Sequence, residues 1–284
     1  PDPEGDSRGP FRTLGRAAAA VKAGDSVEIR AGTYREATTW RTNGTKSSPI
    51  TVSGYEGEMV HISGEDHTIP PGTYGTLIGV SGSWINIQDL DVGHSSWYGV
   101  VVSGENCSVI NVTAHHNWSS GIVINGSYGL VENCRAFSNS LINEYHRPHQ
   151  GGWGFGISAC RSPQYTTIRG CKAWDNWGEG ISTFESTNIT IEDCTSYNNQ
   201  HNYYLSDTTH CLFQRNLSYF TPGNVIQGFV TQNGILMGNE GRAPACSDNT
   251  IINNIGLGGE RNIAIGSNTF ENGLVAFNTF VNAS

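Results

Sequence analysis

The chain has 284 residues, of which 37% are hydrophobic and 14% are charged, and its formal net charge is −9. Its 7 Trp, 11 Tyr and 10 Phe exclude an intrinsically disordered chain. The acidic balance argues against nucleic acid as a partner, because phosphate binding needs a concentrated basic surface. No apolar run approaches the roughly 18 residues that would cross a bilayer, so we expect no membrane partner.

The amino-terminal stretch is expected to form a cap. Residues 13–25 are rich in Ala and predict a short helix that ends near Gly24. We therefore predict that residues 1–25 cover the open first coil of the fold that follows. Strands at 27–32 and 49–54 begin the regular part of the chain.

An internal repeat organises the rest of the chain. Ten-residue segments align without gaps at 108–117, 130–139, 167–176 and 190–199, and a short apolar segment follows each of them. The undisturbed spacing of 22 to 24 residues is too short for a repeat that contains a helix, but it fits three short strands and their bends. The period predicts an all-β parallel β-helix, a single domain over residues 1–284 with its coils in 26–284.

Three columns of the repeat have structural interpretations. The fourth position suits a left-handed bend and holds Asp89, Asn111, Asn133, Gly170 and Asp193. The last position predicts a ladder of stacked amides and holds Asn117, Asn139, Asn176 and Asn199. Cys134, Cys171 and Cys194 share an inward column. Neighbouring coils lie close enough for a disulfide, but we interpret this column as a stack of buried, reduced thiols.

The carboxy-terminal segment 274–284 stops in mid-coil without a visible polar cap. An open apolar end favours aggregation. We therefore expect either that the native chain continues or that another subunit covers this end by self-association.

The opening of the chain carries a family resemblance. The runs at 24–36 and 47–64 resemble the first coils of secreted right-handed β-helix proteins, in particular the family-nine polysaccharide lyases and related carbohydrate-active enzymes. The resemblance implies a right-handed β-helix, a polysaccharide or oligosaccharide substrate, and a secreted, extracellular or periplasmic location. In that family clustered aspartates hold calcium and a lysine removes a proton. The corresponding stretches here, 177–180 and 200–203, do not reproduce the calcium cluster, and no lysine can be carried over.

Two long insertions interrupt the period, near residues 140–155 and 217–233. Long excursions from a regular scaffold usually carry function. Both follow the Asn-ladder turn and precede a strand, so they should overhang the same face. They bracket the strands at 180–184 and 203–207, which predicts a groove there.

Candidate site residues follow from this groove. The first insertion contains the candidate catalytic residues His146, Arg147 and His149. Strand alternation predicts that Ile181 and Tyr204 point inward, whereas Leu205 and the carboxylates Glu179 and Asp207 point outward. Sugar-binding side chains are predicted among the aromatic and polar residues around the groove: Trp97, Trp118, Trp153, Trp177, Tyr145, His201 and Glu185.

Three functions are compatible with this arrangement of residues. In a lyase that cleaves a uronate-containing glycan by β-elimination, Arg147 would bind the uronate carboxylate and His146 or His149 would act as base. A calcium ion held by Glu179 and Asp207 could assist that reaction. The alternatives are a glycoside hydrolase that pairs Glu179 with Asp207 or Glu185, and a β-helix that binds glycans without cleaving them.

Overall fold

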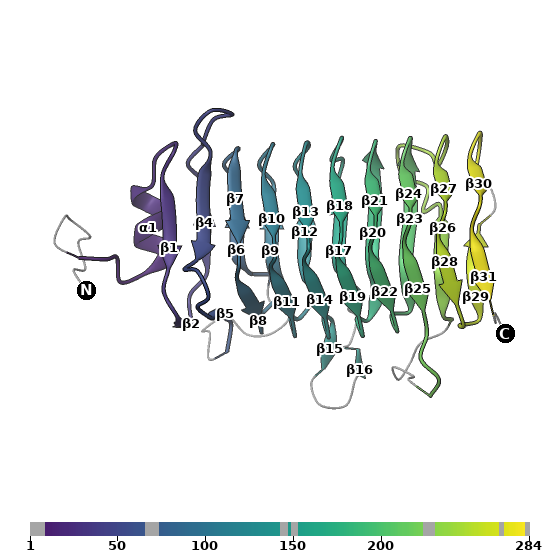
Figure 1. The fold of residues 1–284 in the computed structure, drawn as a ribbon, viewed down its shortest axis with the longest axis horizontal. Helices are drawn as coiled ribbons and strands as arrows, with labels where there is room; N and C mark the ends of the chain where they lie inside the picture. Colours follow the sequence, from purple (N-terminus) through teal and green to yellow (C-terminus); the bar gives the residue numbers. More distant parts are fainter. Residues whose placement is uncertain are drawn as a thin grey trace.

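The computed structural model describes residues 9–65, 74–142, 147–148, 153–223, 231–266 and 270–281. Within these ranges, short parallel strands stack coil upon coil into three long sheets, so that the molecule is an elongated parallel β-helix (Figure 1). The predicted all-β solenoid is therefore confirmed. No helix of the described residues has the length and apolar character needed to cross a membrane.

Each coil contributes one strand to each sheet. Sheet A contains β1 (Ser26–Ile29), β4 (Ile50–Gly54), β7 (Ile85–Gln88), β10 (Ser108–Ile110), β13 (Leu130–Glu132), β18 (Thr167–Arg169), β21 (Thr190–Glu192), β24 (Leu212–Gln214), β27 (Thr250–Ile252) and β30 (Leu274–Ala276). Sheet B contains β2 (Gly32–Tyr34), β5 (Val60–Ser63), β8 (Asp91–Gly93), β11 (Thr113–His115), β14 (Arg135–Phe137), β19 (Lys172–Trp174), β22 (Thr195–Tyr197), β25 (Leu217–Tyr219), β28 (Ile255–Leu257) and β31 (Thr279–Val281).

Sheet C closes the coils and carries the longest strands. It contains β3 (Thr38–Trp40), β6 (Thr76–Val80), β9 (Tyr98–Val102), β12 (Ile122–Ile124), β17 (Gly154–Cys160), β20 (Gly178–Thr187), β23 (His201–Thr209), β26 (Asn233–Gly238) and β29 (Arg261–Ile265). In the first insertion, β15 (Leu141–Ile142) and β16 (Arg147–Pro148) form a separate antiparallel pair.

The predicted columns take their expected places. The bend between sheets A and B has φ between 53° and 62° at Asn111, Asn133, Gly170 and Asp193, which is the left-handed region. At the turn into sheet C, the amide of Asn139 donates to Asn176 at 2.9 Å, and the amide of Asn176 donates to Asn199 at 3.0 Å. These bonds confirm the amide ladder. All seven cysteines are free and buried, as expected for a stack of reduced thiols.

The amino-terminal helix is present but shorter than predicted. Helix α1 (Leu14–Ala20) begins after Thr13, whose hydroxyl accepts the backbone N–H of Arg16. It ends when Val21 takes an extended backbone, before Gly24 is reached. The helix lies across the first coil (Figure 1), and its buried Leu14 joins the core there.

The opposite end of the solenoid exposes apolar side chains. In the last coil Val275, which pairs with the buried core residue Ile251, is 36% exposed, and Phe277 at the following bend is 84% exposed. The inward-facing part of this coil therefore lacks a cover among the described residues. Coverage by more chain or by another copy stays a prediction.

Candidate active site

A row of side chains crosses the outer face of sheet C where its longer strands begin. The parallel register places one residue from each of five successive strands, β17, β20, β23, β26 and β29, side by side: Phe155, Glu179, His201, Asn233 and Arg261. We call these five residues the polar row. Adjacent strands are about 4.8 Å apart, so each side chain lies within reach of its neighbours. The two long insertions precede β17 and β26, as predicted, and therefore enter the sheet at this row.

Glu179 has an unusual environment within the polar row. Its side chain is only 2% exposed, and Oε1 accepts a hydrogen bond from the indole N–H of Trp153. Oε2 has no partner among the described residues. Burial raises the pKa of Glu179 to about 8, against the opposing effect of the Trp153 hydrogen bond, and the charge of Glu240 raises it further. At neutral pH Glu179 is therefore mostly a neutral acid.

His201 is shifted in the opposite sense. The ring is buried, and the amide nitrogen of Asn233 lies 3.0 Å from its Nδ1. Burial lowers the pKa of His201 to about 4. The ring is therefore neutral at physiological pH. With the amide nitrogen of Asn233 donating to Nδ1, the ring hydrogen is on Nε2; with the amide oxygen of Asn233 in that place, the hydrogen is on Nδ1 and Nε2 keeps the lone pair.

Aromatic rings enclose these two groups. The ring of Trp153 lies 6.2 Å from that of Trp177 and 5.9 Å from that of His201, centroid to centroid. Trp177 is buried, whereas Trp153 is 44% exposed and can offer a face to a sugar. Trp97 and Trp118 are half-buried and precede β9 and β12, which lie two strands and one strand before β17 in sheet C, so their role in sugar binding stays a prediction.

The predicted inward and outward faces of β23 were wrong by one residue. The register pairs Ile181 with Tyr203, not with Tyr204, so Tyr203 and Leu205 lie in the core. A one-residue change of register turns every side chain to the opposite face. Tyr204 consequently points outward, and its hydroxyl donates to Oε1 of Glu240 at 3.0 Å.

Asp207 does not pair with Glu179. It lies six residues beyond the partner of Glu179 on β23, which corresponds to about 20 Å along the strand. Asp207 is fully buried, and its carboxylate accepts the backbone N–H of Glu240 at 2.9 Å and that of Arg242 at 2.8 Å. The prediction that Asp207 faces a groove is therefore wrong: this carboxylate holds the loop after β26.

Glu185 is similarly remote from the polar row. It lies six residues after Glu179 on β20, and Oε1 forms an ion pair with Arg242 at 3.4 Å. The described residues thus do not bring Glu179 together with either predicted partner carboxylate. They also do not provide the calcium site predicted at Glu179 and Asp207, because the two side chains are far apart and the oxygens of Asp207 are already bonded to N–H groups.

Four predicted residues cannot be placed. The side chains of His146, His149 and Tyr145 lie outside the described residues, and of Arg147 the structure describes only its backbone in β16. Their roles stay predictions.

Sequence reasoning missed Asn233, Arg261 and Glu240. A signal for two of them was present, because Asn233 and Arg261 each directly precede one of the short apolar segments, in the same way as Glu179. The role of Glu240 had no such signal, because it lies in a loop without a periodic counterpart.

Comparison with known proteins agrees with this architecture. Residues 2–213 match the model of the Pel9A-like right-handed β-helix region. Pectate lyase L of Dickeya chrysanthemi is 27% identical over 274 residues, which cover 89% of this chain and 61% of the relative. The chain thus spans about three fifths of that curated relative.

Solved structures show the same fold. The crystal structure of pectate lyase Pel9A superposes with a TM-score of 0.62 at 19% identity, covering 98% of this chain and 74% of that one. An alginate lyase from Paenibacillus sp. str. FPU-7 superposes with a TM-score of 0.73 at 16% identity, covering 95% and 96%. Since the family model matches about three quarters of the sequence, this chain belongs to the Pel9A-like right-handed β-helix family.

Proposed function

We propose that this protein is a polysaccharide lyase that cleaves a uronate-containing glycan by β-elimination at the polar row. The observation that carries the proposal is the juxtaposition of Glu179 and His201 on adjacent strands, one held as a neutral acid and the other as a neutral base. Opposite pKa shifts of neighbouring groups are typical of acid and base partners. The names of the pectate and alginate lyase relatives support the same reaction class.

The reaction needs three contributions, and the row offers a candidate for each. The reaction uses the tautomer of His201 in which the hydrogen is on Nδ1 and the side-chain oxygen of Asn233 accepts it, so that the lone pair is on Nε2. Nε2 then takes the proton from C5 of the uronate, and the electrons of that C–H bond form the C4=C5 double bond. The bond between C4 and the leaving oxygen breaks, and the carboxylic acid of Glu179 protonates that oxygen. Arg261, two strands from His201, provides positive charge for the uronate carboxylate.

Trp153 positions both the acid and the sugar in this proposal. Its N–H fixes Oε1 of Glu179, and its partly exposed ring can stack on an adjacent sugar of the chain. The glycan would then run across the strands, along the row. Because an enzyme encounters polysaccharides of this kind outside the cytoplasm, the proposal includes a secreted or periplasmic location. Fractionation of the source cells would test that location.

The direct test is the release of unsaturated product, measured by ultraviolet absorbance, from polygalacturonate, alginate and rhamnogalacturonan. Glu179→Gln and His201→Ala should each lower kcat by about 10² to 10⁴. Glu185→Gln is the matched control, because it removes a carboxylate from the same strand but outside the row, and it should retain activity within a few fold. If none of these polymers yields unsaturated product, the lyase proposal is refuted. Glycan binding without turnover would select the non-catalytic alternative.

One observation keeps a glycoside hydrolase as the second candidate. The charge of Glu240 raises the pKa of Glu179, so these two carboxyl groups lie within electrostatic reach of one another. A hydrolase would release reducing sugar without an unsaturated product. It would also lose activity in Glu240→Gln, whereas the lyase mechanism predicts only a modest effect of that substitution.

A further inference from the structure

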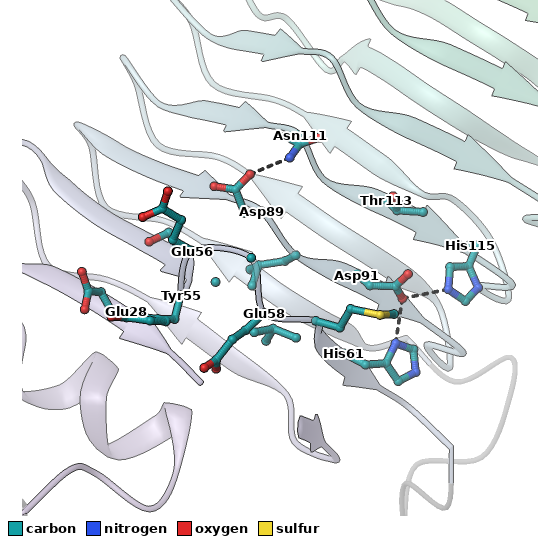
Figure 2. Close-up of a pocket in the computed structure, with 16 residues that line it drawn as sticks. Glu28, Tyr55, Glu56, Glu58, His61, Asp89, Asp91, Asn111, Thr113 and His115 are labelled. Atoms are coloured by element: carbon teal, nitrogen blue, oxygen red, sulfur yellow. Dashed lines mark hydrogen bonds and ion pairs between the residues drawn. The ribbon is translucent and has the colours of Figure 1, made fainter. Parts of the chain in front are cut away.

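A second cluster of chemically reactive side chains lies on the outer face of sheet B, in the coils that precede the polar row and on a different sheet. His61 on β5, Asp91 on β8 and His115 on β11 come together beside an open hollow (Figure 2). His94 and His116 follow β8 and β11 directly. No part of the proposed lyase mechanism uses these residues.

The repeat itself assembles the cluster. His94 and His116 occupy the same bend one coil apart, with φ of 61° and 53°. His115 pairs with Gly93 of the preceding coil, and a Cβ on Gly93 would lie only 2.7 Å from Cε1 of the His115 ring. Glycine therefore leaves the space that this imidazole fills.

Asp91 fixes the orientation of His115. Its Oδ1 lies 2.9 Å from Nε2 of His115 and 2.7 Å from Nδ1 of His61. Because a carboxylate can only accept, the Nε2 of His115 carries the hydrogen, and in the neutral ring Nδ1 keeps its lone pair. A carboxylate that orients an imidazole in this way is the usual outer partner of a metal-binding histidine.

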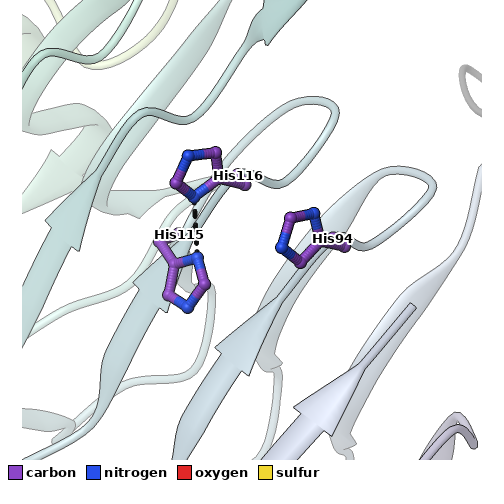
Figure 3. A group of neighbouring side chains, drawn as sticks. All are labelled: His94, His115 and His116. Carbon is purple, nitrogen blue, oxygen red and sulfur yellow. Dashed lines mark hydrogen bonds between the residues drawn. The ribbon is translucent and has the colours of Figure 1, made fainter. Parts of the chain in front are cut away.

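Nδ1 of His115 faces the ring of His116, and the ring of His94 lies beside both. Nδ1 of His115 lies 2.8 Å from Nδ1 of His116, and one ring nitrogen from each of His94, His115 and His116 lies within 4.8 Å of the others (Figure 3). Zinc binds imidazole nitrogen at about 2.0 to 2.1 Å, so two ligands of a tetrahedral site are about 3.3 Å apart. The separation of 2.8 Å is somewhat shorter than that value, and the others stay below 4.8 Å, so rotation of the side chains can bring the three nitrogens to the required spacing.

The geometry points to a binding site for a first-row transition metal ion, Zn²⁺ in particular, formed by His94, His115 and His116, with Asp91 as the positioning residue of His115. Three imidazole nitrogens suit zinc, copper or nickel and disfavour calcium and magnesium, which prefer oxygen. His116 is exposed and the other two rings are half-buried, so a metal ion can enter and a water molecule can complete its coordination.

A metal bound here would join two coils. His94 comes from one coil and the other two ligands from the next, so the ion should bind the folded chain far better than the unfolded one. We therefore expect a rise in Tm with Zn²⁺ that does not depend on catalysis. At a free concentration about 100 times Kd, the rise should be about 5 °C.

The test uses the full chain after treatment with a chelator and its removal. Titration calorimetry with ZnCl₂ should show one ion per chain, and Co²⁺ should produce the strong visible absorption of a tetrahedral nitrogen-ligated site. His94→Asn and His116→Asn should each abolish both signals, because Asn accepts the left-handed bend but lacks the imidazole. Asp91→Asn should weaken Zn²⁺ binding by about 10- to 100-fold.

His210→Asn is the matched control. His210 is exposed and also has a left-handed backbone, with φ of 57°, but it follows β23 and lies away from the cluster. This variant should bind Zn²⁺ as the wild type does. Absence of saturable Zn²⁺ binding by the wild type, absence of the tetrahedral Co²⁺ spectrum, or binding that persists in folded His94→Asn and His116→Asn proteins would each overturn the proposal.

Discussion

Replacing Glu179 by Gln tests the protonation state of the proposed acid without requiring a substrate. Gln keeps an oxygen for the Trp153 N–H but cannot ionise. A rise in the carboxyl pKa from an ordinary value near 4.5 to about 8 corresponds to about 5 kcal/mol, at roughly 1.4 kcal/mol for each pH unit. Between these two pH values only the folded wild-type chain holds the proton, so its stability falls as the pH rises.

Glu179→Gln should lack that fall. From pH 5 to pH 9 the free energy of unfolding of the wild type should decrease by roughly 4 kcal/mol relative to the variant, measured by guanidinium denaturation at each pH. Above about pH 9 no further divergence is expected, because the carboxyl is then ionised in both the folded and the unfolded chain.

The matched control for this experiment is Glu105→Gln, which removes an exposed glutamate in a turn. Its pH dependence should follow that of the wild type. Parallel curves for the wild type and Glu179→Gln would refute the reasoning, because they would show that Glu179 ionises in the folded chain as it does in water. The proposed acid would then be charged at neutral pH.

Four further outcomes are expected. Trp153→Phe keeps an aromatic ring but removes the N–H that lowers the pKa of Glu179. The alkaline limb of the pH–rate profile should therefore move to higher pH in steady-state assays. Asp207→Ala should lower the free energy of unfolding by about 3 kcal/mol in urea titrations, because two backbone N–H groups lose a buried charged acceptor. Asn176→Ala should cost about 2 to 4 kcal/mol in the same titration, since it interrupts the amide ladder. Ellman's reagent should react with the seven thiols only after unfolding, and a reductant should leave Tm unchanged.

The fold could be predicted because the inward columns repeat. Asn139, Asn176 and Asn199 recur at one position, and a parallel register places them directly above one another. The same logic holds for the bend at Asn133 and Asp193, where a left-handed backbone restricts the residue type. A constraint repeated in every coil leaves a period in the sequence, and the period suffices to predict the architecture.

The faces of β23 could not be read in the same way. Tyr203 and Tyr204 are adjacent, and either can take the place of Ile181 when the chain is aligned by apolar pattern alone. Strict alternation also fails at the end of this strand, because Asp207 has a left-handed backbone with φ of 47°. Its carboxylate binds Glu240 and Arg242 in the loop after β26, and the sequence of that loop has no repeated counterpart from which to infer the contact.

The protonation states of the polar row also depend on segments that lie outside the repeat. Glu179 was predicted as a groove carboxylate, which gave its outward position but not its charge. The charge follows from burial beside Trp153, which enters from the first insertion. A sequence without periodicity predicts neither which ring covers a strand nor how much water that ring excludes.

A parallel β-helix can carry few like charges in one column, because equivalent side chains of successive coils lie only about 4.8 Å apart and repel one another. The pKa shifts resolve this conflict in the polar row: at neutral pH Glu179 and His201 are both uncharged, and of the five residues Arg261 alone carries a charge. A chain with a net charge of −9 would otherwise repel an anionic glycan. In the proposed lyase, an acid and a base that are both neutral, with a cation at one end of the row, would accept a uronate and still supply the groups that β-elimination requires.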